Sequence, residues 1–337
     1  MKVLLIADPH VHPFPAFSEL VEVEGHFISS RALDCVLALH WAYDIAVGEA
    51  GCSEVWVLGD LFHVSTGVNQ VLMNLVKNLF QKFLDHGVHT RVVVGNHDCS
   101  IKSKFNLPEV LAPLIDHVYL EPTHSDDETC FASWFTKEDE LPKGEVLFGH
   151  LAVEGAMTGP IEYIPPKGWS TGAFKQYQQV FLGHYHKAQT IGNIEYVGSL
   201  LQHDFGGRND WVGVIMYDIE SRKHTRIENT MSPRFVALTP EEIPERLDNC
   251  YVRVDVDRSA NIERLREVIN SRGAKGVVFQ RVGSKTPTKL EESERVSHRS
   301  VYDVLREYVA KSSCGLNKER LLSVGETIVK CTELQER

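Results

Sequence analysis

Four apolar runs in the sequence each end at a glycine, and a side chain able to bind a metal ion or move a proton follows at once. The segments read VWVLGD, RVVVGNHD, VLFGH and VFLGHYH, and they end at Asp60, Asp98, His150 and His186. Glycine lets the backbone turn tightly beside a ligand, and open α/β sheets bind ligands at the carboxyl ends of their strands. The pattern predicts that separate strand ends deliver these side chains to one shared site.

The candidate ligands combine carboxylate, amide and imidazole groups without a thiolate. They are Asp8 and His10 in ADPH, Asp60 in GDLFH, Asn96 in GNHD, His150 in FGH, and His184 and His186 in GHYH. Such a set suits Mn²⁺, Fe or Zn²⁺ better than a Ca²⁺ cage. Because one ion needs only about four to six donors, a two-metal site with a bridging carboxylate is the economical solution. Two ions about 3.5–4 Å apart can clamp the attacking and leaving oxygens of a phosphoryl displacement.

Each motif has a less specific interpretation when it is taken alone. A D-x-H sequence after a strand is usually part of a loop, and a lone histidine is more often a surface or core residue than a ligand. His184 and His186 would share one face of an extended segment. The presence of all five motifs, in order and at predicted strand ends, favours a site.

The first two-thirds of the chain alternates short β-rich runs with helical patterns. Strands are predicted at 3–7, 54–58 and 90–94, with helices from Ser29 or Ser30 to a stop at Gly51 and over 68–85. This β-α-β-α-β order implies parallel strands with helical crossovers. Further strands are predicted near 117–120, 129–134, 145–148, 179–182, 194–197 and 211–217. They lack long helices between them, so we expect a second, mixed or antiparallel sheet.

The composition changes after Pro233. Residues 251–257 alternate as a strand, a helix with Ile262, Leu265 and Ile269 follows, and 276–282 is another strand, so a small α/β unit is predicted. Residues 283–296 are polar and indicate a linker. Two amphipathic helical stripes lie beyond it, and they either pack on the chain itself or dock a partner. The predicted boundaries are 1–232, 233–283, 284–296 and 297–337.

The overall charge and cysteine content narrow the class of protein. Lys and Arg number 35 and Asp and Glu 46, which gives −11 and argues against a whole surface that binds nucleic acid, although a local basic groove stays open. The 7 cysteines form no CxxC pair, so neither a zinc knuckle nor a disulfide framework is indicated. No signal peptide or membrane span is recognisable. We expect a soluble, cytoplasmic protein.

The ordered motifs D-x-H, GD, GNHD, GH and GHxH resemble those of the calcineurin-like metallophosphoesterase superfamily. GDLFH after ADPHVH is similar to the nuclease subunit of the SbcCD-type recombination and repair exonuclease, and the EYVGSL…DF segment is similar to phage members of that group. The resemblance implies an α/β fold, a four-layer αββα metallophosphoesterase sandwich. It also implies a small α/β capping domain and C-terminal helices that bind an ATPase. The motifs span residues 8–186, and this architecture would cover the whole chain.

The resemblance also implies a role for each matching residue. Asp8, His10 and His186 would hold the first metal, Asn96, His150 and His184 the second, and Asp60 would bridge them. Two Mn²⁺ per chain are implied, with Mg²⁺ or another divalent ion allowed, and a hydroxide between them would attack a DNA phosphodiester. His97 would contact the scissile phosphate and assist the leaving oxygen, with Asp98 orienting its ring. His63 either supports catalysis or serves only its loop.

The expected substrate is DNA, as double-stranded ends and single strands, in recombination, replication and double-strand-break repair. Lys102, Lys104 and Arg208 are candidates to hold DNA phosphates. The resemblance implies an SbcC-type ABC ATPase bound through the C-terminal helices, a homodimer, no membrane, and a host cytoplasm for a phage protein. The alternatives are a phosphatase or cyclic-nucleotide phosphodiesterase, or a non-catalytic scaffold. GDLFHVS departs from the GDxVDRG-like motif of protein phosphatases, and scaffold relatives typically lose ligands that are all present here.

Overall fold

The structure is a computed structural model in which residues 1–282 are described, except 49, 101–105, 125–127, 159–160 and 163–167. Beyond residue 282 it describes only 309, 319–320 and 322–324, so the predicted linker and most of the predicted C-terminal helices lie outside the described residues. The chain divides into two units, Met1–Gly283 and Ser284–Arg337.

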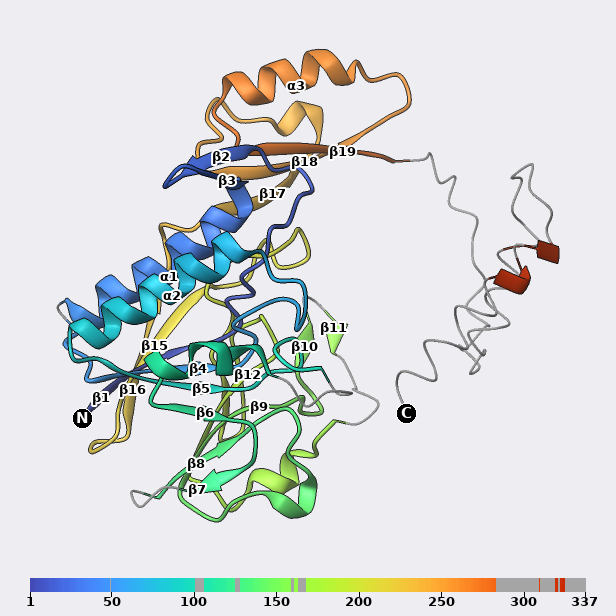
Figure 1. The fold of residues 1–337 in the computed structure, drawn as a ribbon. Coiled ribbons are helices and arrows are strands. Elements are labelled where there is room, and N and C mark those ends of the chain that lie inside the picture. Colours follow the sequence, from blue (N-terminus) through green and yellow to red (C-terminus); the bar gives the residue numbers. More distant parts are fainter. Residues whose placement is uncertain are drawn as a thin grey trace. The chain divides into compact units, whose positions relative to one another are not determined.

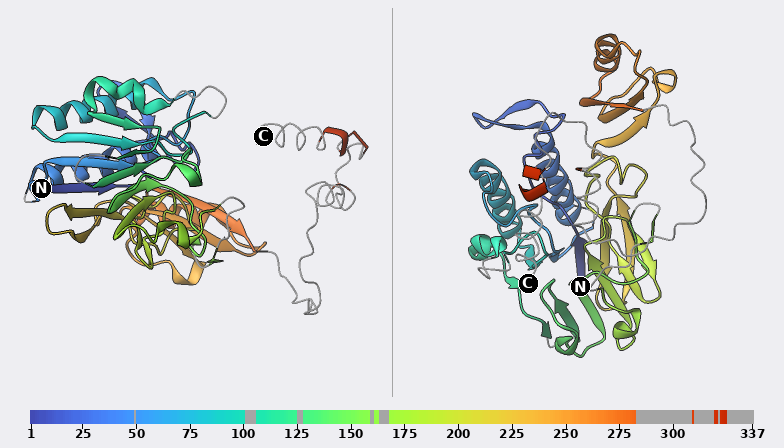
Figure 2. Two further views of the ribbon diagram at one scale, coloured as in Figure 1. Left: turned by 90° about the horizontal axis from the view of Figure 1, so that it is seen from below. Right: turned by 90° about the vertical axis from the view of Figure 1, so that its right-hand side faces the viewer.

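The first six-stranded sheet confirms the predicted β-α-β-α-β opening (Figure 1). Its strand order is β16-β15-β1-β4-β5-β6, with β1 (Lys2–Ile6), β4 (Glu54–Leu58), β5 (His89–Val93) and β6 (His117–Tyr119) parallel, and β15 (Gly213–Asp218) and β16 (Lys223–Glu228) antiparallel. Two helices, α1 (Ser30–Val47) and α2 (Gln70–Asp85), connect the parallel strands. Both lie on the same side of the sheet (Figure 2).

Alternation along each buried strand divides its side chains between two cores. Leu4 of β1 and Val55 of β4 face the core under α1 and α2, whereas Leu5 and Trp56 face the second sheet. Strands covered on both faces need apolar residues at every position, which explains the continuous runs VLLI and VWVL. The same rigid strands then carry the polar side chains that follow each run.

The second six-stranded sheet packs face to face with the first. Its order is β13-β14-β12-β9-β8-β7, built from β7 (Thr123–His124), β8 (Thr129–Ala132), β9 (Val146–His150), β12 (Gln179–Gly183), β13 (Gln189–Ile191) and β14 (Ile194–Tyr196). Its outer face is covered by the 3-10 helix η3 (Thr171–Phe174) and by loops. Helices, two sheets and this outer cover make the four layers of the expected metallophosphoesterase sandwich.

Two predicted strands lie in a different sheet from the one expected. The strand predicted near 117–120 was expected in the second sheet, but β6 pairs parallel with β5 in the first sheet. The strand predicted at 211–217 was expected in the second sheet, but β15 pairs antiparallel with β1 and so extends the first sheet. Its apolar run VIMY suits either sheet, and nothing local specifies the partner. The sequence interpretation also missed β16, whose polar sequence KHTRIE fits an exposed edge. It missed the hairpin of β2 (Leu20–Val23) and β3 (His26–Ser29) as well.

The small α/β unit is present and contains one more strand than predicted. β17 (Arg234–Leu238), β18 (Cys250–Val256) and β19 (Gly276–Arg281) form a parallel three-stranded sheet with α3 (Ile262–Ser271) packed on it. The remaining short elements are β10 (Met157–Thr158), β11 (Ile161–Glu162), η1 (Leu107–Leu114), η2 (Glu138–Glu140) and η4 (Pro240–Glu242). No helix in the described part of the chain has the length and apolar character to cross a membrane.

Candidate metal centre

The predicted ligands converge where five strands end. Asp8 and His10 follow β1, Asp60 follows β4, Asn96 follows β5, His150 ends β9, and His184 and His186 follow β12. β1, β4 and β5 are parallel neighbours, as are β9 and β12, so each sheet presents its carboxyl ends together. The two sheets thus meet at one cluster of potential donors.

Two glycines of the apolar runs, Gly59 and Gly95, are required because side chains of the cluster occupy the space where a Cβ would lie. At Gly59, which has φ +87°, a Cβ would lie 2.0 Å from Nδ1 of His150. At Gly95 it would lie 2.1 Å from Oδ1 of Asp60. These separations are far below van der Waals contact, so only glycine permits strand ends and ligand side chains to approach so closely.

Asp60 lies at the centre of the cluster. Its Oδ2 is 3.5 Å from Nε2 of His10 and 3.4 Å from Nε2 of His150. Its Oδ1 accepts the backbone N–H of His97 at 2.9 Å, which fixes the carboxylate plane. One carboxylate therefore touches imidazoles that come from both sheets.

The first group of donors consists of Asp8, His10 and His186, whose ligand atoms all lie within 4.8 Å of one another. The Nε2 atoms of His10 and His186 are 3.0 Å apart. Both carboxylate oxygens of Asp8 accept the backbone N–H of His184 at 3.1 Å. Asp8 and His10 have left-handed backbone, with φ of 50° and 46°.

The second group consists of Asn96, His150 and His184. Oδ1 of Asn96 lies 3.1 Å from Nε2 of His150 and 3.1 Å from Nδ1 of His184. Nδ1 of His150 donates to the carbonyl of Leu58 at 2.9 Å, so its proton is on Nδ1 and Nε2 faces the group. The indole of Trp134 lies over the ring of His184, with centroids 4.7 Å apart.

The geometry of both groups fits divalent cations. Donors bound to one ion at about 2.1 Å lie roughly 3 Å from each other, and the separations of 3.0 Å within the first group and 3.1 Å within the second match this. Histidine nitrogens and carboxylate or amide oxygens are suitable ligands for such ions. The residues present therefore fit a metal centre.

The electrostatics of the cluster are those of closely packed, buried charges. Burial raises the pKa of Asp8 to about 7. Burial alone would lower the pKa of His150, but the carboxylates of Asp60 and Asp8 outweigh it and raise the pKa to about 9. Burial alone would raise the pKa of Asp60, but the neighbouring His150 outweighs it and lowers the pKa to about 2. Protons held at Asp8 and His150 occupy positions that a bound cation would compete for.

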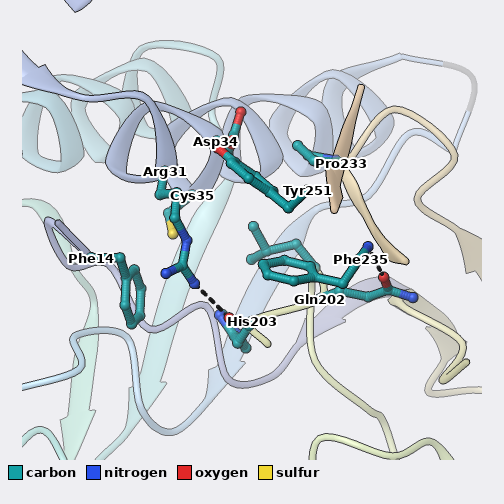
Figure 3. Close-up of a pocket in the computed structure, with 10 residues that line it drawn as sticks. Phe14, Arg31, Asp34, Cys35, Gln202, His203, Pro233, Phe235 and Tyr251 are labelled. Carbon is teal, nitrogen blue, oxygen red and sulfur yellow. Dashed lines mark hydrogen bonds between the residues drawn. The ribbon is translucent and has the colours of Figure 1, made fainter. Parts of the chain in front are cut away.

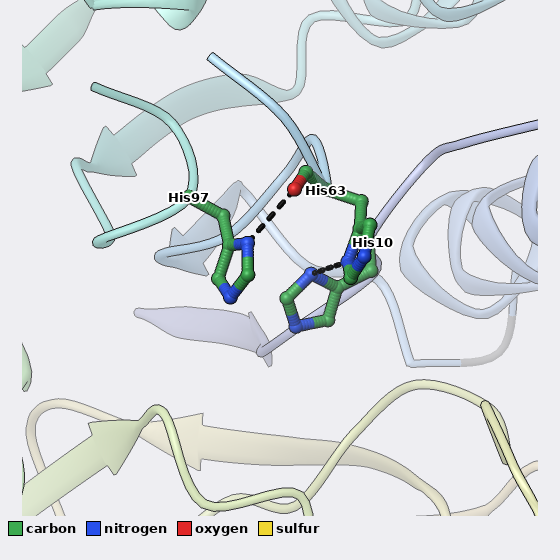
Figure 4. A group of neighbouring side chains, drawn as sticks. All are labelled: His10, His63 and His97. Atoms are coloured by element: carbon green, nitrogen blue, oxygen red, sulfur yellow. Dashed lines mark hydrogen bonds between the residues drawn. The ribbon is translucent and has the colours of Figure 1, made fainter. Parts of the chain in front are cut away.

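His97 and His63 lie beside the first group, with their rings stacked at a centroid distance of 4.9 Å (Figure 4). Nδ1 of His97 donates to the carbonyl of His63 at 2.8 Å, which leaves Nε2 free of that bond. The expectation that Asp98 orients the ring of His97 is wrong, because its carboxylate accepts the backbone N–H groups of Phe62 and Gly95, each at 3.0 Å. Asp98 instead ties the GNHD turn to the GDLFH turn.

His63 contacts a predicted ligand directly. Its Nδ1 lies 3.2 Å from Nδ1 of His10. Burial, and then nearby His97, lower the pKa of His63 to about 4, so its ring is neutral at pH 7. The three nitrogens of His10, His63 and His97 also lie within 4.8 Å of one another. Of the two alternatives for His63, this contact favours support of the site over a role confined to its loop.

The candidate DNA contacts are less informative. Lys102 and Lys104 lie outside the described residues. Arg208 is exposed, and its Nη1 donates to the carbonyl of Phe205 at 2.8 Å. It is therefore available at the surface of the loop that follows the GSLLQHDF segment.

Two residues at the centre were not identified from the sequence. Nε2 of His203 donates to the carbonyl of Asp8 at 2.9 Å, and burial, followed by His186, lowers the pKa of His203 to about 3. Trp134 covers His184. Their sequence signal was weak, because neither follows an apolar run that ends in glycine. The position of His203 in the motif-bearing segment GSLLQHDF was the one usable indication.

Comparisons with known proteins found similarity to nuclease subunits. The chain is 27% identical over 274 residues to exonuclease subunit 1 of Enterobacteria phage T4, covering 75% of this chain and 80% of that protein. It is 30% identical over 122 residues to SbcD, a subunit of the nuclease SbcCD, from Staphylococcus epidermidis, covering 34% of this chain and 31% of that protein. No protein-family model matches the chain.

Solved structures give weaker likenesses. A structure described as a novel archaeal phosphodiesterase aligns with 68% of this chain and 100% of its own, at 13% identity and a TM-score of 0.35. The Pseudomonas putida nuclease MPE aligns with 66% of this chain and 87% of its own, at 13% identity and a TM-score of 0.31.

The double sheet and its paired donor groups fit the resemblance to calcineurin-like metallophosphoesterases. Within that class the chain is similar to SbcD-like proteins of phage type.

Proposed function

We propose that the protein is a two-metal-dependent DNA exonuclease and endonuclease that hydrolyses phosphodiester bonds. The single observation that carries the proposal is the position of Asp60, whose Oδ2 lies 3.5 Å from Nε2 of His10 and 3.4 Å from Nε2 of His150. A carboxylate that joins two donor groups is what a bridged pair of ions requires. The printed names of both relatives, an exonuclease subunit and a nuclease subunit, support DNA as the substrate.

In this proposal Asp8, His10 and His186 would hold one cation and Asn96, His150 and His184 the other. When bound, two such cations would supply charge neutralisation for the phosphate and an activated water. The preference for Mn²⁺ rests on the resemblance to SbcD-like nucleases, since the donors suit several divalent ions.

His97 would act on the phosphate through Nε2. The hydrogen bond from its Nδ1 to the carbonyl of His63 fixes the ring and the tautomer. A protonated His97 would present an N–H from Nε2 to the phosphate or to the leaving oxygen, as general acid catalysis requires. Its ring lies 4.9 Å, centroid to centroid, from that of His10, which keeps it beside the first group.

His63 would position His10. If Nε2 of His10 binds a cation, its proton sits on Nδ1 and donates to Nδ1 of His63, 3.2 Å away. His63 then carries its own proton on Nε2. The bond would hold the ring of His10 in its ligand orientation.

Digestion assays test the proposed function. Linear double-stranded and single-stranded DNA are incubated with Mn²⁺ and wild-type protein, His97→Ala, or the control His26→Ala, which changes an exposed histidine in the β2–β3 hairpin. We expect His97→Ala to bind two Mn²⁺ and to lose about 100-fold or more of the cleavage rate. Equal cleavage by wild type and His97→Ala would remove His97 from the mechanism.

The same preparations separate the alternative functions. Turnover of a phosphate monoester or a cyclic nucleotide without cleavage of DNA would identify a phosphatase or a phosphodiesterase of that kind. Failure of the wild-type protein to bind two Mn²⁺ would favour a scaffold.

We further propose that the protein works as a homodimer with a separate ABC-type ATPase, bound by residues 297–337 beyond the linker 284–296. Both relatives are named as subunits, which supports a partner. The charge of −11 also suggests that the partner provides much of the grip on DNA. Removal of 297–337 is expected to abolish association with the ATPase in gel filtration while Mn²⁺-dependent hydrolysis by the remaining residues 1–296 persists.

A further inference from the structure

A buried arginine lies between the small three-stranded sheet and the first donor group. Arg31, near the start of α1, is 8% exposed. Its guanidinium lies 4.6 Å from the ring centroids of Phe14 and of Phe17, and Nη2 donates to the carbonyl of His203 at 2.6 Å. Within the described residues this cation is held by aromatic faces and a carbonyl, not by an ion pair. Such an arrangement depends on every surrounding ring staying in place.

The small sheet supplies two of those rings. Phe235 of β17 and Tyr251 of β18 lie 5.4 Å and 5.8 Å from the guanidinium carbon of Arg31 (Figure 3). The hydroxyl of Tyr251 donates to Oδ2 of Asp34 at 2.6 Å, and Lys275, just before β19, pairs with the same carboxylate. Arg31 and Asp34 are three residues apart on one face of α1. The small sheet therefore packs against a single turn of α1, and this packing is called its seating below.

On the side away from the small sheet, His203 links Arg31 to the first donor group. Nε2 of His203 donates to the carbonyl of Asp8 at 2.9 Å, and its ring centroid lies 5.1 Å from those of His10 and of His186. Asp8 and His10 have φ of 50° and 46°. Residues other than glycine adopt this left-handed backbone conformation only when the surrounding structure imposes it. His203 is one of the groups that impose it.

The packing at this junction leaves no room for a ligand. The cavity lined by Phe14, Arg31, Tyr251 and their neighbours has a volume of about 10 Å³, enough for one water molecule at most. The junction is thus an internal contact between two parts of the chain and not a binding pocket.

We propose that Arg31 and His203 are positioning residues that couple the seating of the small sheet to the first cation group, Asp8, His10 and His186. The coupling rests on the proposed function, because it requires that this group binds a cation. Seating of the sheet would strengthen cation binding, and cation binding would strengthen seating by the same factor. The second group touches this chain of residues only at Asp8, through the backbone N–H of His184 and through Nδ1 of His150 at 3.9 Å. Its side chains contact neither Arg31 nor His203, so the second cation serves as an internal control.

Substitutions of His203 test the cation side, with Mn²⁺ binding measured by calorimetry and by electron paramagnetic resonance. His203→Leu removes the donor to Asp8 and is expected to weaken the first cation about 10-fold to 100-fold, the usual effect of losing a group that orients a ligand. His203→Gln keeps an N–H donor and should restore affinity to within about threefold. The second cation is expected to be unchanged in both variants.

Substitutions at the junction test the sheet side. Tyr251→Phe removes only the hydrogen bond to Asp34, and Arg31→Met removes the charge and the bond to His203. Both are expected to weaken the first cation, Arg31→Met more. Arg266→Ala, on the exposed side of α3, is the control in the same small unit and should have no effect. In the wild type, Mn²⁺ should slow amide hydrogen exchange in β18.

The outcomes separate the two proposals. Unchanged affinity for the first cation in His203→Leu and Tyr251→Phe, or an equal loss at both cations, would overturn the coupling while the two-metal site stands. A wild-type protein that binds fewer than two Mn²⁺ would overturn the proposed function and the coupling with it.

Discussion

The two donor groups of the metal centre use the same kinds of side chain but are supported in different ways. His150 of the second group is 0% exposed, ends strand β9 and donates to the backbone of Leu58 in the first sheet. The first group stands on left-handed backbone at Asp8 and His10, and its support comes from His203 and Arg31. The contrast rests on His150, which lies within a strand, because the other donors of both groups follow strand ends and His184 also has a positive φ of 96°.

This difference indicates that the second group is held rigidly, whereas the first group can respond to changes elsewhere in the chain. Strand ends held by two sheets preorganise the second group whether or not the small sheet is seated. The first group depends on a junction that includes residues from β17 and β18. The first group is therefore where changes elsewhere in the chain could alter cation affinity.

The largest expected effect comes from removing one histidine of each group. His150→Ala leaves buried Asp60 and Asp8 without their cationic partner, so it should cost about 3–5 kcal/mol of unfolding free energy without metal. His186→Ala should cost about 1 kcal/mol or less, because His186 is only partly buried. Urea unfolding in EDTA measures both, and each variant should bind one Mn²⁺ fewer. Equal destabilisation would abolish the proposed contrast.

The next effect concerns the glycine that makes room for the second group. Gly59→Ala combines strain at φ +87° with a Cβ only 2.0 Å from Nδ1 of His150, and should cost about 3 kcal/mol or more along with the second cation. Gly67→Ala is the matched control, because Gly67 has φ +70° and open space around it. It should cost about 1–2 kcal/mol. Similar thermal unfolding for the two variants would show that the close approach to His150 is unimportant.

The pH dependence of cation binding should distinguish the groups. Burial raises the pKa of Asp8 to about 7, and the neighbouring carboxylates raise that of His150 to about 9. Cations must displace these protons, so affinity for the first cation should stop rising above about pH 7 and that for the second above about pH 9. Calorimetry in buffers of different ionisation enthalpy measures the protons released. Identical pH profiles for the two cations would contradict the assignment.

The same two shifts contribute to how the stability of the metal-free protein changes with pH. The stabilisation from charged His150 is fully present below about pH 6.5, its unfolded pKa, and is lost as pH rises through about 9. The raised pKa of Asp8 destabilises the fold above about pH 4, fully so above about 7. Buried histidines with a lowered pKa, such as His63 and His203, have the opposite effect below about pH 6.5, so a net fall of the unfolding free energy in EDTA is expected only between about pH 7 and 9, where His150 acts. A rise over that range would contradict the burial of these groups.

A smaller effect is expected at Trp134, whose ring covers His184. Trp134→Leu should weaken the second cation about threefold to tenfold, because the imidazole loses a packing neighbour that restricts its orientation. Trp169→Leu is the control, since Trp169 contacts Phe174 and no predicted ligand. Stepwise Mn²⁺ titration measures the change. A loss confined to the first cation would show that Trp134 was placed with the wrong group.

The smallest effect is expected at Arg208. If its guanidinium holds a DNA phosphate, Arg208→Ala should weaken DNA binding about twofold to threefold and reduce the salt slope by about 0.9. The slope of log K against log salt from fluorescence anisotropy is the appropriate measurement. An unchanged slope would remove Arg208 from the DNA-binding surface.

Sequence reasoning identified the elements that follow periodic rules. Apolar runs located β1, β4, β5, β9 and β12, and the last four of these runs end in glycine. Gly59 and Gly95 have the close contacts that explain two of those glycines. It could not assign β15 to the first sheet, because a short apolar strand pairs according to tertiary contacts. The contact of His203 with Asp8 and that of Asp98 with Phe62 also join residues that are far apart in the chain. Such contacts leave no periodic trace.

Anomalous scattering from crystals soaked in Mn²⁺ tests the central claim most directly. The account predicts two ions about 3.5–4 Å apart on either side of Asp60, one bound by Asp8, His10 and His186 and the other by Asn96, His150 and His184. A single ion, or two ions that do not share Asp60, would contradict it.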